Sequence, residues 1–286
     1  MAISRAQLAK ELEPGLNALF GLEYGRYENE HSEIFDEESS DRAFEEEVML
    51  GGFSTAPSKG EGTAISFDEA RETYTARYTH ETIALAFSIT EEAIEDNLYD
   101  RLASRYTKAL ARSMAQTKQI KAAAILNNAF LAGANAIGDG VALCSNAHPS
   151  LSGNQTNLLT TAADLNETSL EQMLIDIAGL TDERGLKIAV RGTKLVIPKE
   201  LQFIAERVLN SNLRSGTADN DNNAMKNMGM LPEGAVVNHF LTDTDAYFIK
   251  TDAPNGFKYF NRAAIKTAME GDFDTGNMRF KARERY

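Results

Sequence analysis

The chain has 286 residues, 43% of them hydrophobic and 25% charged, with a formal net charge of −13. These proportions are ordinary for a soluble globular protein, and no apolar run reaches the roughly 18 residues of a membrane-spanning helix. The acidic balance argues against a surface that binds nucleic acid as a whole, because phosphate contacts require clustered Lys and Arg. A local basic patch stays open, and the single Cys144 excludes an internal disulfide.

Residues 1–47 are predicted to form an N-terminal arm with little core of its own. Residues Ser4–Phe20 could form a helix, interrupted at Pro14. The segment Glu28–Glu47 holds ten acidic residues, opposed only by Arg42. Two interpretations stay open: a solvated surface segment, or an arm that lies on a complementary basic surface of another subunit. In the second, the candidate contacts are Glu37, Glu38, Glu45 and Glu46.

Residues 48–89 are predicted to form an extended loop, a long β-hairpin. Glycine and proline crowd its tip between Gly51 and Gly62, with Pro57 and Lys59 in between. This is not a phosphate-binding loop, because the second glycine of that motif is missing before Lys59. Residues Arg71–Ile89 then alternate with a period of two and are rich in Thr, Tyr, Phe and Ile, which predicts one strand of about 19 residues.

Residues 90–132 are predicted to form one long helix. Thr90 is a suitable N-cap and Gly133 a suitable stop. The whole stretch from Thr63 to Ala132 contains no glycine and no proline. A helix of about 40 residues would span roughly 60 Å. Elements of this length indicate a protein in which parts of the chain extend beyond the compact domain and contact neighbouring subunits.

Residues 133–240 are predicted to form an α/β region after a loop. Thr168 and Glu171 fit a capping box, with Gly185 as the helix stop. Short strands are expected at Lys187–Val190 and Lys194–Ile197, followed by a helix over Lys199–Asn210 and a polar loop over Ser211–Met230. Cys144 and His148 lack the further ligands that zinc needs. The calcium-like start at Asp219 lacks the glycine and the glutamate of a calcium loop.

Residues 241–286 are predicted to consist of short strands separated by turns. The last strand alternates fully: Met278, Phe280 and Ala282 face one way, whereas Arg279, Lys281, Arg283 and Arg285 face the other. Two interpretations stay open for this basic face. It could pair with the acidic arm of another subunit, or it could be an edge that charge protects from aggregation.

Taken in order, these elements resemble the major capsid proteins of tailed bacteriophages, which have the Hong Kong 97-type (Johnson) fold. The resemblance covers nearly the whole chain. It rests on the order of several short sequence segments rather than on any single segment. These are the glycine-rich tip before the long strand, Ser88–Glu92 with Glu95–Tyr99, Ser145–Pro149 with Gly153 and Asn157, Lys194–Leu201, and Leu241–Asp243 with Ala246–Ile249.

The resemblance implies an α+β fold with an N-terminal arm (1–47), an extended loop (48–89), a spine helix (90–132), an axial domain with connecting loops (133–240) and return strands of a peripheral domain (241–286). It implies a structural protein without cofactor or metal, which assembles as pentamers and hexamers into an icosahedral shell around packaged double-stranded DNA. The shell would be built in the cytoplasm of the host bacterium. A portal, a separate scaffolding protein and a decoration protein are the further partners that it suggests.

The candidate intersubunit contacts are Glu37, Glu38, Glu45, Glu46, Pro57, Lys59, Arg279, Lys281 and Arg283. Some family members crosslink a loop lysine to a neighbour's asparagine, and Lys59 is the natural candidate here. No partner asparagine or catalytic acid can be identified, so a crosslink is not expected. Two alternatives stay open: an encapsulin-like compartment with the same fold, and an α+β enzyme or small-molecule binding protein. The enzyme alternative lacks a nucleophile motif and a dinucleotide fingerprint.

Overall fold

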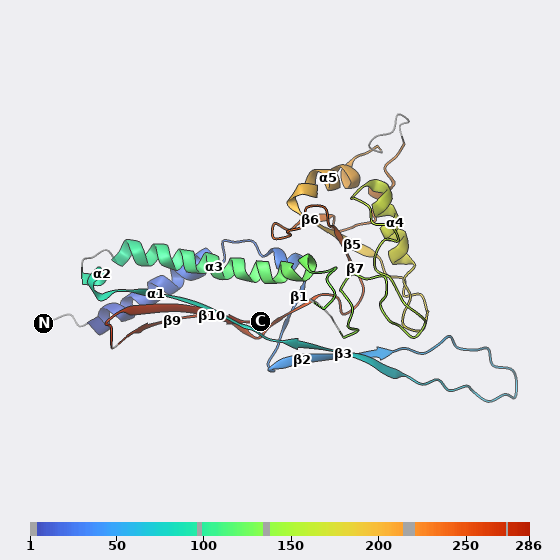
Figure 1. Ribbon diagram of the computed structural model, residues 1–286, viewed down its shortest axis with the longest axis horizontal. Coiled ribbons are helices and arrows are strands. Elements are labelled where there is room, and N and C mark those ends of the chain that lie inside the picture. Colours follow the sequence, from blue (N-terminus) through green and yellow to red (C-terminus); the bar gives the residue numbers. More distant parts are fainter. Residues whose placement is uncertain (1–4, 96–98, 134–137, 214–220, 273) are drawn as a thin grey trace. The chain divides into compact units, whose positions relative to one another are not determined.

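The computed structural model (Figure 1) describes residues 5–95, 99–133, 138–213, 221–272 and 274–286. The chain forms two compact units, each made of segments far apart in the sequence. Unit 1 comprises Met1–Ala43, Thr79–Ala122 and Lys258–Tyr286, and unit 2 comprises Phe44–Tyr78 and Ala123–Phe257. Unit 2 is therefore built mainly from an insertion between the elements of unit 1.

Unit 1 is a three-stranded antiparallel sheet covered on one face by helices. The sheet order is β4-β10-β9, with β4 at Thr82–Ile89, β10 at Met278–Arg285 and β9 at Ala263–Gly271. The helices are α1 (Arg5–Tyr24), α2 (Glu91–Glu95) and α3 (Tyr99–Asn127), whose last residues belong to unit 2. A 3-10 turn, η1 (Glu30–Glu33), leads into β1 (Asp36–Ser39), which pairs in parallel with β8 (Lys258–Asn261).

The core of unit 1 follows from the alternation of β10. Phe280 and Ala282 are buried against Leu16 and Phe20 of α1 and against one face of α3. The α3 residues in this cluster are Ala103, Leu110, Ala111 and Met114, at the spacing of one helical face. The predicted alternation of β10 is confirmed, because its Arg279, Lys281 and Arg283 are exposed on the opposite face.

Unit 2 contains a hairpin and a small α/β body. The hairpin consists of β2 (Phe44–Gly51) and β3 (Arg71–Thr79). The body has a sheet of order β6-β5-β7, with β5 at Gly192–Ile197, β6 at Ala235–Val237 and β7 at Phe248–Thr251. Its helices are α4 (Glu167–Ala178), η2 (Lys199–Leu201), α5 (Gln202–Asn210) and α6 (Ala224–Met228).

The body of unit 2 encloses a second core. Leu170 and Leu174 of α4 pack with Leu195 and Ile197 of β5 and with Ala205 of α5. Gly192 begins β5 at a crowded position of this core: a Cβ there would lie 2.8 Å from Leu174 Cδ2 and 2.9 Å from Ile249 Cγ2, so these buried methyl groups would have to move.

The N-terminal arm departs from the prediction in two ways. Helix α1 runs through Pro14 without interruption. The arm is also more firmly packed than a sparse set of anchors suggests: it has no separate core, but Leu16, Phe20, Ile34 and Phe35 are all buried in unit 1, where Leu16 and Phe20 share the core of α3 and β10. Packing of Leu16 and Phe20, one turn apart, stabilises a helix that the local proline disfavours.

The predicted 19-residue strand is two strands with different partners. β3 pairs with β2, whereas β4 pairs with β10, so the hairpin does not extend to residue 89. Between them, His80 is buried and shares a 3.0 Å hydrogen bond with Ser40. Backbone hydrogen bonds between Glu81 and Tyr286 begin the new pairing. The break is therefore imposed by contacts with distant segments, which the local alternation of residues does not reveal.

The predicted spine helix ends early. Helix α3 stops at Asn127 rather than at residue 132, and the Asn127 side chain donates to Phe240 O and accepts from Thr242 N. These hydrogen bonds tie the end of the helix to a loop of unit 2. Residues 96–98 of the predicted helix lie outside the described residues.

Three predictions in the middle of the chain are also corrected. Helix α4 is capped by Asn166, in a capping box with Ser169, and ends at Gly179 rather than at Gly185. The strand expected at 187–190 is not formed, because Ala189 has φ of +52°, which breaks an extended strand. The loop expected over 211–230 contains α6, and its residues 214–220, where the calcium-like segment begins, lie outside the described residues.

Candidate assembly surfaces

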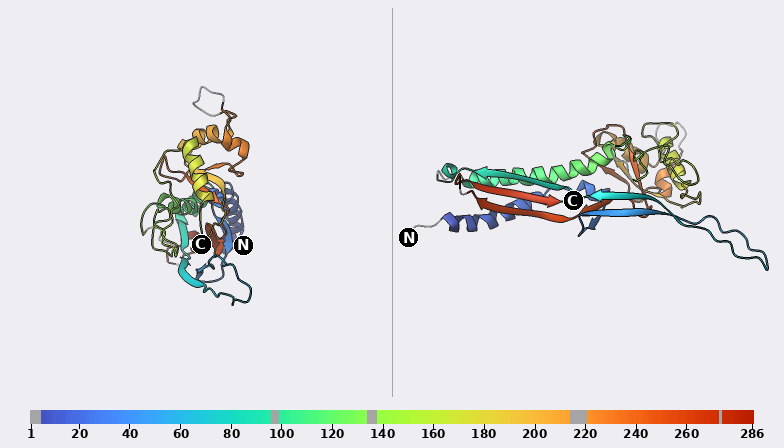
Figure 2. Two further views of the ribbon diagram at one scale, coloured as in Figure 1. Left: turned by 90° about the vertical axis from the view of Figure 1, so that its right-hand side faces the viewer. Right: turned by 60° about the horizontal axis from the view of Figure 1, so that its bottom comes forward.

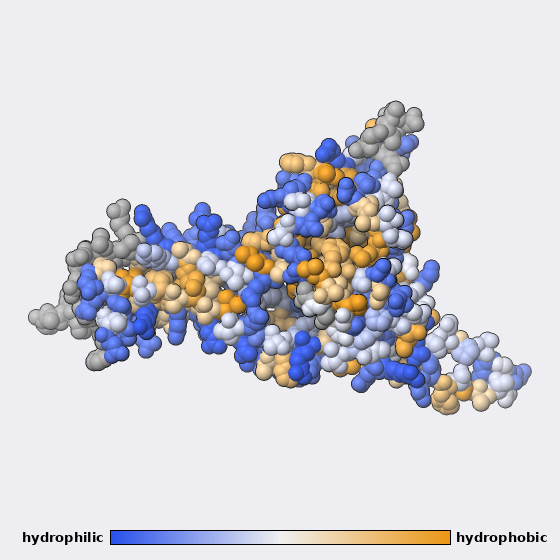
Figure 3. All heavy atoms as spheres, viewed as in Figure 1, coloured by the Kyte–Doolittle hydropathy of each residue, from blue (hydrophilic) through white to orange (hydrophobic). Residues whose placement is uncertain are grey.

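The hairpin of unit 2 exposes apolar side chains along its strands and its tip. Between the end of β2 and the start of β3, the chain forms an irregular tip (Figures 1 and 2). Phe67 is 97% exposed and Phe53 is 60% exposed. The other large exposed apolar residues of the hairpin are Phe44, Val48, Met49, Leu50 and Ile65, and several apolar atoms are visible at the tip in Figure 3. A clustered exposed apolar surface of this kind marks an interaction site.

A turn of the same unit holds the hairpin where its irregular tip begins, just beyond the ends of β2 and β3. The Arg184 guanidinium donates to Gly52 O at 3.2 Å and to Glu69 O at 2.7 Å, one carbonyl on each arm of the hairpin. Glu183 is buried beside it and accepts from Thr73 Oγ1 at 2.9 Å. Gly51 allows this close approach, because a Cβ there would lie 2.9 Å from the Glu183 carboxylate and 3.1 Å from Arg71 O. We call residues 182–186 with Gly51, Gly52 and Glu69 the hairpin clamp.

A hydrogen-bonded rung lies just beyond the hairpin clamp. The backbone N–H and the hydroxyl of Ser54 both donate to one Asp68 carboxylate oxygen, at 2.7 and 2.6 Å. These hydrogen bonds lower the pKa of Asp68 to about 2. The carboxylate therefore stays ionised at neutral pH and keeps the two arms of the tip together.

Replacing Arg184 with Ala is expected to loosen the hairpin without unfolding unit 2. Hydrogen bonds to charged groups are worth about 1.5–3 kcal/mol, so loss of both should raise local opening about tenfold or more. Hydrogen exchange of residues 50–54 and 68–71 measures this opening. Arg191→Ala, which changes an exposed arginine of unit 2 outside the hairpin clamp, is the control. Equal exchange in both variants would contradict the role of the clamp.

The predicted acidic contacts have partners within their own chain. Glu37 lies 3.2 Å from His31, and Glu38 lies 3.5 Å from Lys258 on the neighbouring β8. Glu46 accepts a 2.6 Å hydrogen bond from Arg77 across the hairpin. Glu45 lies half-buried on β2 and is not free of interactions either. The structure thus places these four residues in intrachain contacts, on two different sheets.

The predicted basic contacts lie together. Arg279, Lys281 and Arg283 project from the central strand of the unit 1 sheet, on the face opposite the helices. In register beside them stand the small residues Ser88, Ala86 and Ala84 of β4, and Lys266 of β9 adds another cation. Arg279 is ion-paired with Asp272, and Glu270 is also on this face. We call this surface the basic sheet face. Its small flanking residues leave the long cationic side chains standing above the sheet.

Pro57 and Lys59 lie in the exposed irregular tip of the hairpin. The glycine-rich sequence predicts this position correctly, but it does not single out the exposed phenylalanines or the hairpin clamp. Phe67 could have been noticed as a large apolar residue in a polar, turn-rich stretch. Arg184 gives no such signal, because its partners are backbone carbonyls more than 100 residues away in the sequence.

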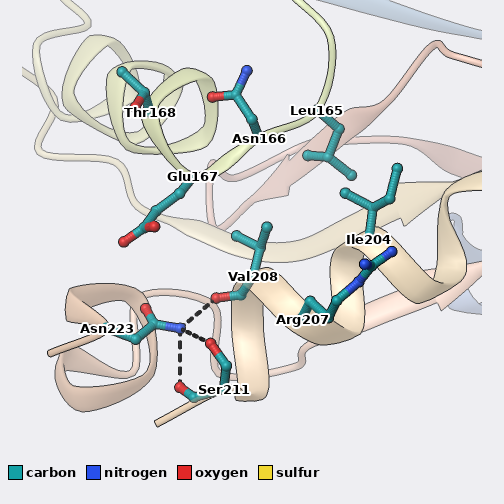
Figure 4. A pocket seen from close by; sticks show the side chains of 9 residues that line it. All are labelled: Leu165, Asn166, Glu167, Thr168, Ile204, Arg207, Val208, Ser211 and Asn223. Carbon is teal, nitrogen blue, oxygen red and sulfur yellow. Dashed lines mark hydrogen bonds between the residues drawn. The ribbon is translucent and has the colours of Figure 1, made fainter. Parts of the chain in front are cut away.

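Unit 2 also has a shallow cavity of about 330 Å³ between α4 and α5 (Figure 4). Asn223 donates from its amide to Val208 O, Ser211 O and Ser211 Oγ, and its amide oxygen caps α6. These side-chain contacts join α5 to α6. Among the described residues, no group of three or more His, Cys, Asp and Glu could hold a metal ion. None of the described helices is long and apolar enough to span a bilayer.

Comparison with known proteins gives a consistent result. A family model described as phage capsid protein matches residues 73–286. The capsid of bacteriophage JBD30 aligns with a TM-score of 0.58 at 13% identity, covering 76% of this chain and 92% of that one. The capsid of the myovirus XM1 aligns at 0.50 and 13% identity, covering 88% and 83%.

A virus-like particle from Pyrococcus furiosus also aligns, with a TM-score of 0.50, 10% identity and coverage of 95% and 92%. No curated protein sequence gives a significant match. Because the family model spans about three quarters of the chain, this protein belongs to the phage capsid protein family, and its α+β structure is of the Hong Kong 97 type.

Proposed function

We propose that this chain tiles the head of a tailed double-stranded DNA phage as hexamers and pentamers of an icosahedral shell. Its role is structural rather than catalytic. Packaged DNA would be contacted without sequence preference, and the shell would be built in the host cytoplasm. A separate scaffolding protein, a portal and a decoration protein are the expected partners, and the JBD30 capsid, a protein of the same fold, is decorated with minor capsid protein trimers.

The exposed apolar hairpin supports this proposal most directly. A two-stranded hairpin has no hydrophobic core of its own and is marginally stable in water. This hairpin nevertheless carries two phenylalanines that are mostly in solvent, Phe53 and Phe67. Such side chains gain free energy when a neighbouring subunit covers them. Assembly would then stabilise the hairpin by mass action.

We also propose the domain division 1–47, 48–89, 90–132, 133–240 and 241–286 as the functional one, with axial contacts supplied by residues 133–240. The α/β body of unit 2 contains most of that segment. In this proposal the body surrounds the symmetry axis of each capsomer, while the hairpin reaches over a neighbour.

Electron microscopy of the expressed chain, with and without its neighbouring genes, tests the proposal. Closed shells or isolated hexamers and pentamers are the expected result, and a stable monomer under both conditions would contradict it. The contents of the shells separate the alternatives. Packaged DNA supports a phage head, whereas a bound enzyme would favour the encapsulin-like compartment, which the likeness to the Pyrococcus particle keeps as second candidate.

The basic sheet face is proposed as an intersubunit contact. Arg279 is paired with Asp272, but Lys281 and Arg283 have no ion pair among the described residues, so they can meet acidic groups of another subunit. The acidic residues predicted as their partners, Glu37, Glu38 and Glu46, already have intrachain contacts. Lys281→Glu with Arg283→Glu should raise the assembly threshold about tenfold or more at low salt, because like charges would then face each other. Light scattering over a concentration series measures this. Arg105→Glu with Lys108→Glu, which reverses two exposed cations on α3 of unit 1, is the matched control. Unchanged assembly of the Lys281 and Arg283 variant would exclude the contact.

A further inference from the structure

The segment that follows α1 is attached to α3 through one buried histidine. His31 of η1 is almost fully buried, with 3% of its side chain exposed. Its backbone N–H donates to Gln119 Oε1 at 3.0 Å, and its ring Nδ1 lies 3.0 Å from Gln119 Nε2. The next residues, Ile34 and Phe35, bond back to the His31 carbonyl and are buried as well. The docking of residues 28–35 on α3 therefore centres on this pair of side chains.

The geometry fixes where the protons are. A backbone N–H can only donate, so the Gln119 atom that faces it must be the amide oxygen. The Gln119 amide nitrogen then faces His31 Nδ1 and can only donate to it. His31 Nδ1 is consequently an unprotonated acceptor, and Nε2 carries the ring proton. That proton is donated to Glu37 Oε1 at 3.2 Å.

A second ring proton does not fit this arrangement. Protonated Nδ1 would present N–H to the N–H of Gln119. If the amide turned over, its nitrogen would face the backbone N–H of His31 instead, so one buried donor loses its acceptor in either case.

The charged groups near His31 have opposite effects on the protonation of its ring. Glu37 on β1 favours the imidazolium, but its side chain is half exposed and therefore screened. Lys118 on α3 disfavours it, and the Tyr259 ring on β8 covers the imidazole at 5.1 Å. Burial, followed by the charge of Lys118, lowers the pKa of His31 below its usual 6.5.

We infer that His31 and Gln119 form an acid-sensitive latch, which holds residues 28–35 on α3 while His31 is neutral and releases them when it is protonated. The released segment binds a proton more readily than the docked one. The docked state is therefore fully favoured above a pH of about 6.5, the pKa of a free histidine. Below that value, the ratio of docked to released chains falls by up to tenfold per pH unit, until the pH drops below the lowered pKa of docked His31.

Hydrogen exchange of the full chain between pH 8 and pH 5, corrected for the intrinsic pH dependence, tests the latch. Protection of residues 34 and 35 should fall by up to tenfold per unit below about pH 6.5. In Gln119→Glu, a carboxylate can accept hydrogen bonds from both the backbone N–H and the protonated Nδ1. The protection of residues 34 and 35 at pH 5 should therefore be kept or increased. In His31→Asn, the amide oxygen can replace Nδ1 and cannot be charged, so protection should become independent of pH.

His80→Asn is the matched control, because His80 is also a buried histidine of unit 1 but is bonded to Ser40. This variant should keep the wild-type pH dependence of residues 34 and 35. The inference is overturned if the unchanged chain protects these residues equally at pH 5 and pH 8. It is also overturned if Gln119→Glu loses protection in acid as the unchanged chain does. Neither result depends on whether shells form.

Discussion

Replacing both Phe53 and Phe67 with Asp is expected to prevent shell formation at concentrations where the unchanged chain assembles. Both side chains are largely in solvent, so the folded subunit loses little when they are changed. Burying one phenylalanine contributes about 1.5–3 kcal/mol. Two such contacts in each subunit correspond to roughly 10²–10⁴ in the association constant.

The assembly threshold, measured by light scattering and checked by electron microscopy, is the quantity to compare. Thr55→Asp with Ser58→Asp adds the same two charges to the same exposed tip and should leave the threshold nearly unchanged. Circular dichroism of the subunits confirms that folding is intact. If the phenylalanine variant assembles like the control, the hairpin does not reach its neighbours through these side chains.

Replacing Lys118 with Met is expected to destabilise unit 1 by about 3–5 kcal/mol, the usual cost of removing one partner from a buried ion pair. Lys118 Nζ lies 2.8 Å from Glu284 Oε2, and the two side chains are 15% and 2% exposed. The rings of Tyr24, Tyr259 and Tyr286 surround the ammonium at 5.3, 6.0 and 5.5 Å. Without Lys118, the Glu284 carboxylate keeps only a hydrogen bond from Tyr24 among its described partners.

The neighbouring phenols do not relieve the buried Glu284 charge, since a proton passed from a phenol to the carboxylate would only move the negative charge to the phenolate. Burial and then the charge of Glu284 raise the pKa values of Tyr24 and Tyr286, so both stay protonated at neutral pH. Denaturant unfolding of unassembled subunits measures the loss. Lys118→Met combined with Glu284→Gln should recover most of it, because the buried charge is removed.

Lys121→Met is the surface control, because Lys121 pairs with Glu81 where both side chains are well exposed. An exposed ion pair contributes at most about 1 kcal/mol. A similar small effect for Lys118→Met would mean that the buried pair adds nothing to unit 1.

The elements that the sequence predicts well are those specified by their own residues. The alternation of β10 is visible because each buried residue, such as Phe280, has a charged neighbour on either side. The glycine-rich tip is visible because turn residues cluster there. The break at His80 is different, since it depends on Ser40 and Tyr286, which local patterns do not bring together. Pro14 likewise stays helical only because distant residues pack on α1.

The candidate contacts also divide into those that the local sequence specifies and those that depend on distant residues. Charge alternation places Arg279, Lys281 and Arg283 on one exposed face, as predicted. A cluster of acidic residues does not show which of them already have partners, and Glu38 pairs with Lys258, a residue near the other end of the chain. Pairs of this kind cannot be recognised without the parallel register of β1 and β8.

The position of β10 has a consequence for the order in which a newly made chain folds. β10 is the central strand of the unit 1 sheet, between β4 and β9. All segments of unit 2 have been synthesised by Phe257, before either β9 or β10. On the ribosome, unit 2 can therefore fold while α1 and α3 still expose the apolar faces that unit 1 later buries. Pairing of β4 with β10 joins segments nearly 200 residues apart, which makes it a slow step. A nascent chain thus becomes an assembly-competent subunit only after translation has passed residue 285, and until then it needs protection from aggregation.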